Sequence, residues 1–348
     1  MKILIISDAW KPQVNGVVRT YEYIGAELER MGHDFHVIGP ADFPVRMKLP
    51  GYPEIELALK PARRLTRMID DYAPDAIHIA TEGPLGIEAR GYCIKKGLRF
   101  TTSYHTHFPD YIAKRIGKFL PFLAGPVKKA AIKSLRNFHD KASAILIATQ
   151  SLEDELKSWN FTAPMHRLSR GARLDIFRPG PPEVFHDLPR PVAIFVGRVA
   201  IEKNLEAFLD MEWQGSKVIV GDGPDMPELK RKYPHAVFTG QKEGERLGAH
   251  YRSADVFVFP SRTDTFGMVL VEALASGLPV AAYNVTGPRD IITEPHLGVL
   301  EETDLAAAAQ KALAIVDGKE QRRAHVERHY TWPAVAEQFV NVLREVGK

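Results

Sequence analysis

The chain has 348 residues, 45% of them hydrophobic, and this length allows about two domains of ordinary size. Its one cysteine, Cys93, excludes an intrachain disulfide scaffold and fits a reducing, cytosolic compartment. The formal net charge of +3 is unevenly distributed along the chain. Residues 1–170 carry 25 Lys+Arg and 18 Asp+Glu, whereas residues 171–348 carry 21 Lys+Arg and 25 Asp+Glu. The basic first half indicates an anionic partner such as nucleic acid or a lipid surface.

The chain begins MKILIISDAW, and its apolar run from Ile3 to Ile6 is too short for a signal-peptide core. This run predicts a first buried strand instead. The longest uncharged stretch, residues 273–288, falls short of the roughly 18 apolar residues that a membrane-spanning helix needs. We therefore expect a protein that does not cross a membrane.

Short Val/Ile-rich runs alternate with segments of helical periodicity, a pattern typical of parallel strands buried on both faces. The predicted strands are 2–7, 34–39, 75–80, 100–104 and 144–148, then 192–196, 217–220, 236–239, 255–259 and 279–282. The pattern predicts two doubly wound α/β domains, 1–176 and 192–331, joined by a proline-rich linker at 177–191. Ligands of such sheets bind at the carboxyl ends of the strands, so we expect a cleft between the two domains.

The first turn after a strand contains Asn15-Gly16 and leads into apolar residues spaced as in an amphipathic helix. Asn15 is predicted to cap this helix, and Gly16 to let the backbone approach a ligand. A plain helix cap without a ligand is the alternative.

The stretch RFTTSYHTHFPDY, residues 99–111, places His105 and His107 where a predicted strand ends. Three interpretations compete. His-x-His with Asp110 could bind a metal, but no third ligand follows at a persuasive spacing. His105 could be a buried structural histidine, or a cleft histidine that hydrogen-bonds a substrate hydroxyl or shares a proton, which we favour.

Two basic segments lie in the first half. Residues 111–142 carry eight Lys/Arg against one acid, interleaved with apolar residues, and residues 60–69 carry four cations. Such segments can lie in an anionic membrane interface. The alternative is ordinary amphipathic helices with a solvated basic face.

In the second half, a strand ends before Gly197, and Arg198 and Lys203 flank the start of a helix. Arg and Lys together suit a diphosphate, although two solvated cations are the alternative. A second glycine-rich turn contains Gly221. Both glycines are predicted to let the backbone approach a ligand.

The stretch SRTDTFGMVLVEAL, residues 261–274, keeps Asp264 and Glu272 eight positions apart in apolar surroundings. A helix that begins near Phe266–Gly267 would offer its N-terminal amides to a phosphate, with a carboxylate for hydroxyl groups. A solvated acid on a core helix is the alternative.

Taken in order, these motifs resemble the retaining, nucleotide-sugar-dependent glycosyltransferases of the GT-B fold, a family 4-like resemblance that covers nearly the whole chain. The matching stretches are Asn15-Gly16, YHTH at 104–107, GRVAIEKNL at 197–205, VGDGP at 220–224, DTFGMVLVEALASGLPV at 264–280 and YTWPAVAEQFVNVL at 330–343. The resemblance implies two Rossmann-like domains facing a cleft, an N-terminal acceptor domain and a C-terminal donor domain. It also implies a final helix, 332–348, that returns to the first domain.

The resemblance also implies roles for single residues. Glu272 matches the carboxylate that binds the ribose hydroxyls, and Asp264, where the family commonly has Glu, matches the one that faces the donor sugar. The implied catalytic residues are His105, Asp264, Arg198 and Lys203, and the implied donor-binding residues are Asn15, Gly16, Gly197, Arg198, Lys203, Gly221, Phe266, Gly267 and Glu272. The resemblance implies a nucleotide sugar as co-substrate and no cofactor. No Asp-x-Asp metal clamp occurs in the sequence, so we expect no metal.

The stretch SYHTHFPDY resembles the branch of the family that glycosylates diacylglycerol, including sulfolipid synthases. We therefore expect transfer of a hexose, glucose or glucuronic acid, from a UDP-sugar to diacylglycerol by a cytoplasmic protein peripheral on the inner face of the membrane. The alternatives are a GDP-mannose-dependent mannosyltransferase that acts on a lipid or polysaccharide intermediate, and a catalytically dead nucleotide-sugar-binding regulator. We expect neither nucleic acid nor an obligate protein as partner, since no nucleic-acid motif is present.

Overall fold

The computed structural model describes residues 1–13, 15–49, 52–105, 109 and 121–347. It divides into two compact units, the first made of residues 1–170 with 332–348, and the second of residues 171–331. Each unit has one six-stranded parallel sheet flanked by helices. The predicted fold class, α/β with two Rossmann-like doubly wound sheets, is confirmed.

The first sheet runs in the order β2-β1-β5-β6-β7-β8, with all neighbours parallel. Its order reverses at β1, which lies between β2 and β5. Its strands are β1 (Lys2–Ile6), β2 (Asp34–Ile38), β5 (Ala76–Ile79), β6 (Thr101–Ser103), β7 (Ala144–Ile147) and β8 (Met165–Arg167), and an antiparallel hairpin is formed by β3 (Arg46–Leu49) and β4 (Tyr52–Ala58). The sequence did not predict β3, β4 or β8, because β8 is three residues long and none of the three is a clean Val/Ile run.

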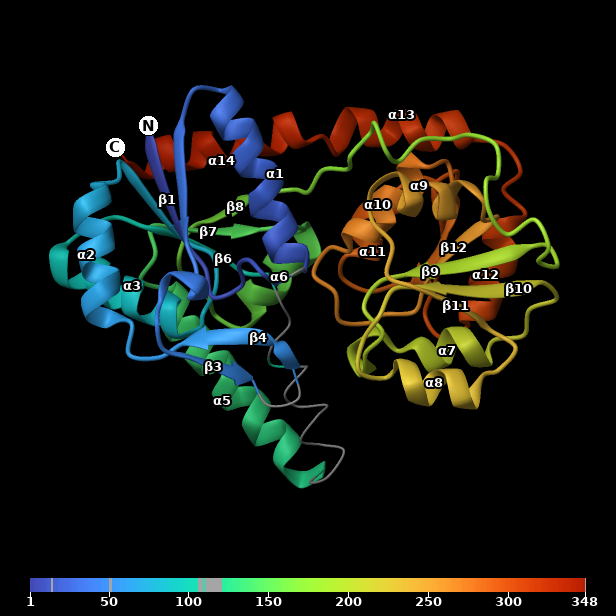
Figure 1. Cartoon of the computed structure of the whole chain (residues 1–348), viewed down its shortest axis with the longest axis horizontal. Helices are drawn as coiled ribbons and strands as arrows, with labels where there is room; N and C mark the ends of the chain where they lie inside the picture. Colours follow the sequence, from blue (N-terminus) through green and yellow to red (C-terminus); the bar gives the residue numbers. More distant parts are fainter. Residues whose placement is uncertain (14, 50–51, 106–108, 110–120, 348) are drawn as a thin grey trace. The chain divides into compact units, whose positions relative to one another are not determined.

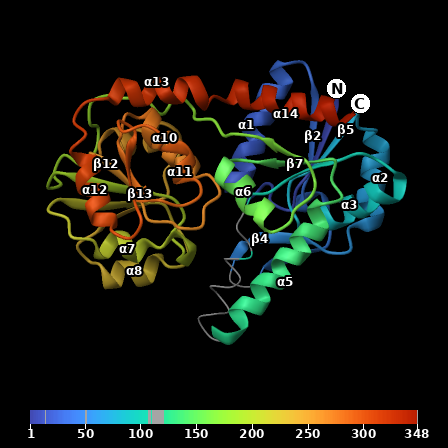
Figure 2. The same ribbon diagram turned by 180° about the vertical axis from the view of Figure 1, so that it is seen from behind.

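Helices cover both faces of the first sheet. They are α1 (Gly16–Arg30), α2 (Ala62–Tyr72), α3 (Pro84–Lys96), α5 (Pro121–His139), α6 (Gln150–Ser158) and α14 (Trp332–Gly347), with a 3-10 turn η1 at Pro40–Asp42. The helix α2 lies beside α3, and α1 beside α14, in both Figure 1 and Figure 2. On one face, Leu65 and Leu85 pack with Ile77 and Ile79 of β5. Burial of each such side chain contributes about 1.5–3 kcal/mol.

Because side chains alternate along a strand, His78 between Ile77 and Ile79 points to the opposite face. There its ring contacts Phe339 of α14 and Tyr21 of α1. A polar strand residue is thereby enclosed between two helices.

The second sheet runs in the order β11-β10-β9-β12-β13-β14, again with parallel neighbours, and reverses at β9. Its strands are β9 (Val192–Val196), β10 (Ser216–Val220), β11 (Val237–Gly240), β12 (Val256–Phe259), β13 (Val280–Tyr283) and β14 (Gly298–Glu301). Only β14, a short edge strand that begins with glycine, was not predicted.

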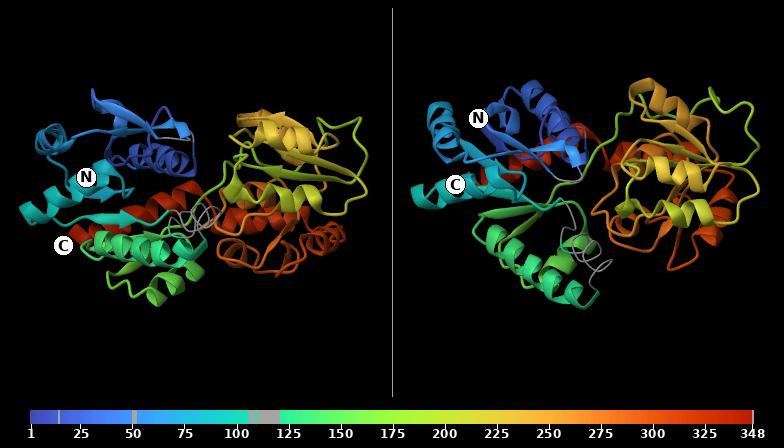
Figure 3. Two further views of the ribbon diagram at one scale, coloured as in Figure 1. Left: turned by 90° about the horizontal axis from the view of Figure 1, so that it is seen from below. Right: turned by 60° about the horizontal axis from the view of Figure 1, so that its bottom comes forward.

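The helices of the second unit are α7 (Leu205–Asp210), α8 (Met226–Lys232), α9 (Gly244–Arg252), α10 (Met268–Ala275), α11 (Pro288–Ile291), α12 (Leu305–Leu313) and α13 (Lys319–His329), with a 3-10 turn η2 at Ile201–Lys203. Phe208 of α7, Leu229 of α8 and Leu305 of α12 share one core with Phe195 and Val258 of the sheet. The helices α10 and α13 pack together on the other face, and Figure 3 shows helices on both sides of this sheet.

The proline-rich segment 177–191 is fastened to the second unit. The Ser253 hydroxyl oxygen accepts hydrogen bonds from the backbone N–H groups of Glu183 (2.8 Å) and Val184 (3.0 Å). The buried Arg252 donates to the Glu183 carboxylate, 2.9 Å from its Nε. The segment is therefore held against the second unit and belongs to it. The chain crosses from one unit to the other at Arg170–Gly171 and at Thr331–Trp332.

Candidate functional site

The carboxyl edge of the second sheet gathers most of the predicted donor-binding residues. Gly197 and Arg198 follow β9, Gly221 follows β10, and residues 261–267 follow β12. The strand order reverses at β9, and in sheets of this type ligands bind at the carboxyl ends of the strands beside such a reversal. The sequence therefore places these residues at the usual ligand-binding edge of such a sheet.

Lys203 and Asp264 form an ion pair across this edge. The Lys203 Nζ lies 2.5 Å from the Asp264 Oδ1, and the two side chains are 20% and 23% exposed. Two neighbouring contacts fasten the loops that carry them: Asn204 Nδ2 donates to the Pro260 carbonyl (3.0 Å), and the Ser261 hydroxyl to the Glu202 carbonyl (3.3 Å). A cation and a carboxylate are thus held at a fixed separation within reach of solvent.

The helix α10 begins beside this pair. It starts at Met268 after Gly267, whose φ of +88° lies in the left-handed region that favours glycine. A helix start, with the positive end of the helix dipole, is in general suited to an anion. The predicted helix start is confirmed, with Leu270 and Leu274 buried.

Phe266 precedes this helix, and Glu272 lies within it. The Phe266 ring is 5% exposed and packs edge-to-face against Tyr330, with 5.9 Å between ring centres. Glu272 is the fifth residue of α10, little more than one turn into the helix. Its Oε2 accepts a hydrogen bond of 2.9 Å from the Tyr251 hydroxyl, and burial and this carboxylate raise the pKa of Tyr251 well above its usual range. Glu272 is therefore an oriented acid.

Gly197 and Gly221 have a packing role that the sequence interpretation did not include. A Cβ on Gly221 would lie 1.8 Å from the Gly197 carbonyl oxygen, and the φ of Gly221 is +145°. The two strand ends therefore approach each other more closely than any side chain allows. A ligand is not needed to explain glycine at 221.

In the first unit, Asn15 caps α1 as predicted. Its Oδ1 accepts hydrogen bonds of 3.0 Å from the N–H groups of Val17 and Val18, and Gly16 is the first helical residue. This cap satisfies two of the amides that a helix start leaves without partners.

His105 follows β6 and lies within a buried polar cluster. Its Nδ1 is 3.0 Å from the Arg170 guanidinium, and its Nε2 is 3.0 Å from the Tyr21 hydroxyl. Burial, and then the charge of Arg170, hold the pKa of His105 well below its usual range. The ring is consequently neutral at physiological pH.

Sequence reasoning missed the partners of His105. Tyr21 is one of the regularly spaced residues of the amphipathic helix predicted after Asn15-Gly16, and His78, Ser103 and Arg170 were not singled out. All four side chains are at least 94% buried. A histidine inside a predicted Val/Ile strand is the one signal that could have pointed to the cluster. Burial lowers the pKa of His78 to about 3.

Asp8, after β1, occupies the start of α3. Its carboxylate accepts hydrogen bonds from the N–H groups of Leu85 (2.9 Å) and Gly86 (3.3 Å) and from the Thr81 hydroxyl (3.0 Å). Burial raises the pKa of Asp8. The anion position of this helix is thus filled by the protein itself.

Other expectations fall partly outside the described residues. His107 and Asp110, which were considered as metal ligands beside His105 but not favoured, lie outside that part of the chain. Within the described ranges no group of three or more His, Cys, Asp or Glu is arranged to hold a metal. No helix in the described ranges combines the length and hydrophobicity needed to span a bilayer.

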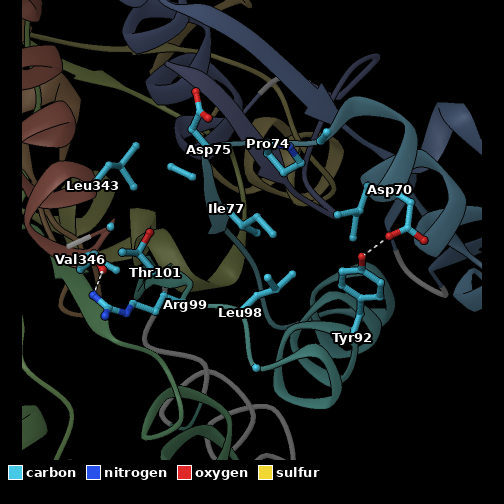
Figure 4. A pocket seen from close by; sticks show the side chains of 15 residues that line it. Asp70, Pro74, Asp75, Ile77, Tyr92, Leu98, Arg99, Thr101, Leu343 and Val346 are labelled. Carbon is cyan, nitrogen blue, oxygen red and sulfur yellow. Dashed lines mark hydrogen bonds between the residues drawn. The ribbon is translucent and has the colours of Figure 1, made fainter.

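A hollow of about 470 Å³ lies at the other edge of the first sheet (Figure 4). Ile77, Leu98 and Leu343 contribute apolar side chains. At its rim, the Tyr92 hydroxyl donates to Asp70 and the Arg99 guanidinium donates to the Val346 carbonyl (2.9 Å). Because it lies at the amino ends of β5 and β6, it takes no part in the sites above.

Comparison with known proteins agrees with this arrangement. A family model described as glycosyltransferase family 4 matches residues 14–176, and one described as glycosyl transferases group 1 matches residues 190–317. The chain is 30% identical to a GDP-mannose-dependent alpha-mannosyltransferase of Mycolicibacterium smegmatis over 98% of its length and 96% of that protein. It is 30% identical to an alpha-monoglucosyldiacylglycerol synthase of Acholeplasma laidlawii over 80% of its length and 79% of that protein.

Among solved structures, a sucrose-phosphate synthase from Thermosynechococcus elongatus superimposes with a TM-score of 0.76 at 20% identity, covering 99% of this chain and 98% of that one. Two Rossmann-like sheets with a phosphate-suited edge are the architecture of the GT-B glycosyltransferases. This chain belongs to glycosyltransferase family 4.

Proposed function

We propose that this chain is a retaining hexosyltransferase that moves a sugar from a nucleoside-diphosphate donor to a lipid at an anionic membrane surface. The observation that carries the proposal is the Lys203–Asp264 ion pair beside the N-terminus of α10, at the reversal point of the second sheet. A cation, a helix start and a carboxylate together match the phosphates and hydroxyls of a nucleotide sugar.

The cations act on the leaving group. As the bond between the sugar C1 and the phosphate oxygen breaks, negative charge grows on the diphosphate. We assign the compensation of that charge to Arg198, Lys203 and the start of α10, without a metal, since such preorganised groups cost no reorganisation during the reaction. Lys203 would exchange part of its contact with Asp264 for the phosphate.

The acids and His105 act on the rest of the donor. We assign the ribose hydroxyls to Glu272, held by Tyr251, and the sugar to Asp264 and His105. The acceptor oxygen bonds to C1 on the face that the diphosphate leaves, and its proton passes to the departing phosphate oxygen. Attack on the same face retains the configuration at the anomeric carbon.

For the donor we favour GDP-mannose, because the relative that spans 98% of this chain is named for it. A UDP-hexose, the expectation from the sequence alone, is the second candidate. It is supported by the glucosyldiacylglycerol synthase, which matches 80% of the chain at the same identity.

The lipid acceptor is supported by the surface of α5. Phe122 is 73% exposed near the start of this helix, and Lys129 and Lys133 are exposed further along it. An exposed aromatic ring close to lysines suits an anionic bilayer interface. By contrast, α2 buries Leu65 and Ile69 in the core, so it is an ordinary amphipathic helix with exposed Arg63 and Arg64.

The first test is nucleotide release from GDP-mannose, UDP-glucose and UDP-glucuronic acid, with and without vesicles that contain diacylglycerol and an anionic lipid. Arg198→Ala controls for contaminating hydrolases. Vesicle-dependent release of GDP supports the favoured donor, and release of UDP supports the second. Donor binding without transfer to any acceptor would mean a nucleotide-sugar-binding regulator and overturn the proposal.

The second test is vesicle sedimentation of Phe122→Ser beside Val316→Ser, which removes an 82%-exposed apolar side chain from the second unit. We expect binding to anionic vesicles to fall by about threefold to tenfold for Phe122→Ser only. Equal binding of both variants and the wild type would contradict the role of α5.

A further inference from the structure

Hydrogen bonds connect Arg170 to a set of five further polar side chains in the first unit. They are His105, Tyr21, Ser103, His78 and Thr101. His105 contacts Arg170 and Tyr21, at 3.0 Å each. The Tyr21 hydroxyl donates to the Ser103 hydroxyl at 2.9 Å and lies 2.7 Å from His78 Nε2. The His78 Nδ1 lies 2.8 Å from the Thr101 hydroxyl. Four parts of the chain, namely α1, β5, β6 with the residue His105 that follows it, and the segment after β8, thereby meet in one polar cluster.

Because Arg170 can only donate, it fixes which atoms donate and which accept in these hydrogen bonds. A guanidinium carries only N–H donors, so the His105 Nδ1 must accept from Arg170. The ring proton of a neutral His105 therefore sits on Nε2 and is donated to the Tyr21 oxygen. Tyr21 in turn donates its own proton onward to Ser103. A tyrosine hydroxyl can donate or accept, so Tyr21 adapts to the ring, whereas Arg170 cannot.

Arg170 is itself held in place. It is 6% exposed, and its Nη1 donates to the carbonyls of Leu168 (2.6 Å) and Ser169 (2.8 Å). These contacts direct its Nη2 at His105. Although burial lowers the pKa of Arg170 to about 10, the guanidinium stays protonated at neutral pH.

We infer that Arg170 is a positioning residue that locks His105 as the neutral tautomer with its proton on Nε2. This inference rests on the proposed role of His105 beside the donor sugar. The lock then gives the sugar a fixed, uncharged ring to lie against, rather than a group that shares a proton. With Nδ1 engaged by Arg170 and Nε2 by Tyr21, the ring has no nitrogen left to take a proton from an acceptor. The proton-sharing interpretation from the sequence is thereby replaced.

The groups around the His105 ring also favour its neutral form. Among the described residues, Arg170, His78 of β5 and His139 of α5 act on the pKa of the ring, and Tyr21 of α1 contacts it. An acid, Glu82, acts on the pKa of Tyr21. Glu82 contacts His139 Nε2 at 3.0 Å. The acid is thus engaged by another histidine, and burial with the positive charge of Arg170 keeps the pKa of His105 well below its usual range.

The test is nuclear magnetic resonance of the histidine ring nitrogens in the full chain, with no donor added. The His105 signals are assigned by their loss in His105→Asn. We expect wild-type His105 to show the Nε2–H tautomer unchanged between about pH 5.5 and 8. A proton on Nδ1, or titration of the ring within that range, would overturn the lock.

Three variants separate the hydrogen bond from the rest of the structure. Arg170→Met removes the donor and should give a mixture of tautomers, whereas Arg170→Gln keeps an N–H donor without the charge and should restore Nε2–H. Tyr21→Phe should leave the tautomer unchanged, because Arg170 still occupies Nδ1. Arg167→Met, at an exposed arginine of β8, is the matched control.

Kinetics then test the consequence for catalysis. We expect Arg170→Met to lower kcat by about tenfold to a hundredfold with a nearly constant donor KM, and Arg170→Gln to recover most of kcat. Altered tautomers with unchanged kcat would overturn the positioning role. Should the wild type transfer no sugar at all, the proposed function fails, while the tautomer result stands independently. If Arg170→Met does not fold, the tautomer and titration of wild-type His105 still decide whether the ring is locked.

Discussion

The two units have the same type of sheet but use its carboxyl edge differently. In the first unit, the start of α3 is occupied by the Asp8 carboxylate, and His105 is enclosed by Arg170 and Tyr21. In the second unit, α10 starts after a glycine, and the Lys203–Asp264 pair is about one-fifth exposed. The same topology therefore yields one edge closed by the protein's own side chains and one suited to an incoming anion.

The largest effect should come from removing the cation of the second edge. Lys203→Ala takes away the charge that we assign to the leaving diphosphate, so sugar transfer should fall by about a hundredfold to a thousandfold. The steady-state rate at saturating donor measures this loss. Arg231→Ala, at an exposed cation of α8, should keep full activity. Equal rates for both variants would remove the contrast between the two edges.

A large effect on stability should come from the glycine contact that shapes the second edge. Gly221→Ala forces a Cβ to within 1.8 Å of the Gly197 carbonyl at a φ of +145°, so we expect it to destabilise the protein by about 3 kcal/mol. Urea denaturation measures the change. Gly91→Ala is the matched control, since no atom lies within 4 Å of the added Cβ in α3, and it should stabilise by about 0.5–1 kcal/mol. A mild effect at 221 would mean that the strand ends can separate.

The closed edge should make the first unit sensitive to acid. The pKa of His78 is about 3 in the folded chain, against 6.5 ordinarily, so below about pH 6.5 the unfolded chain binds a proton that the folded one does not. Stability should then fall by about 1.4 kcal/mol per pH unit for this histidine, with the loss complete near pH 3. Urea midpoints between about pH 7 and 5 should fall less steeply for His78→Asn than for the wild type. His36→Asn, at an exposed histidine, should match the wild-type slope.

The smallest effect should come from Tyr251→Phe. Loss of the 2.9 Å hydrogen bond leaves Glu272 in place but less firmly oriented, so nucleotide affinity should weaken by about threefold to tenfold. Isothermal titration with GDP and UDP measures it. A stronger loss than that of Glu272→Gln would indicate that Tyr251 acts on the nucleotide directly.

The second edge was predictable because its residues stand in loops and carry their own signals. Glycines after strands, Arg198 and Lys203 at a helix start and two acids in an apolar stretch each depart from a plain structural pattern. All ten predicted strands are present, because buried parallel strands read as continuous apolar runs. The edge strands β8 and β14 were not predicted, because short, half-exposed strands have no continuous apolar run.

The first edge could not be assembled in this way. Tyr21 fits the apolar spacing of α1, and His78 is a single polar residue in a strand, so neither reveals that they meet. Arg170 lies 65 positions from His105, and only the pairing of β6, β7 and β8 brings them together. The sequence could also not show that the space beside Gly221 is filled by the Gly197 carbonyl.

The way the chain enters and leaves the second unit has a practical consequence. The Ala172 N–H donates to the Tyr330 carbonyl at 3.0 Å, so residues 171–331 begin and end beside each other. In the sequence, residues 171–331 are a single continuous insertion between the two parts of the first unit, and the two ends of this insertion adjoin. A corresponding segment from a relative with another donor preference could be transplanted at the same two junctions, leaving the remainder of the chain unaltered.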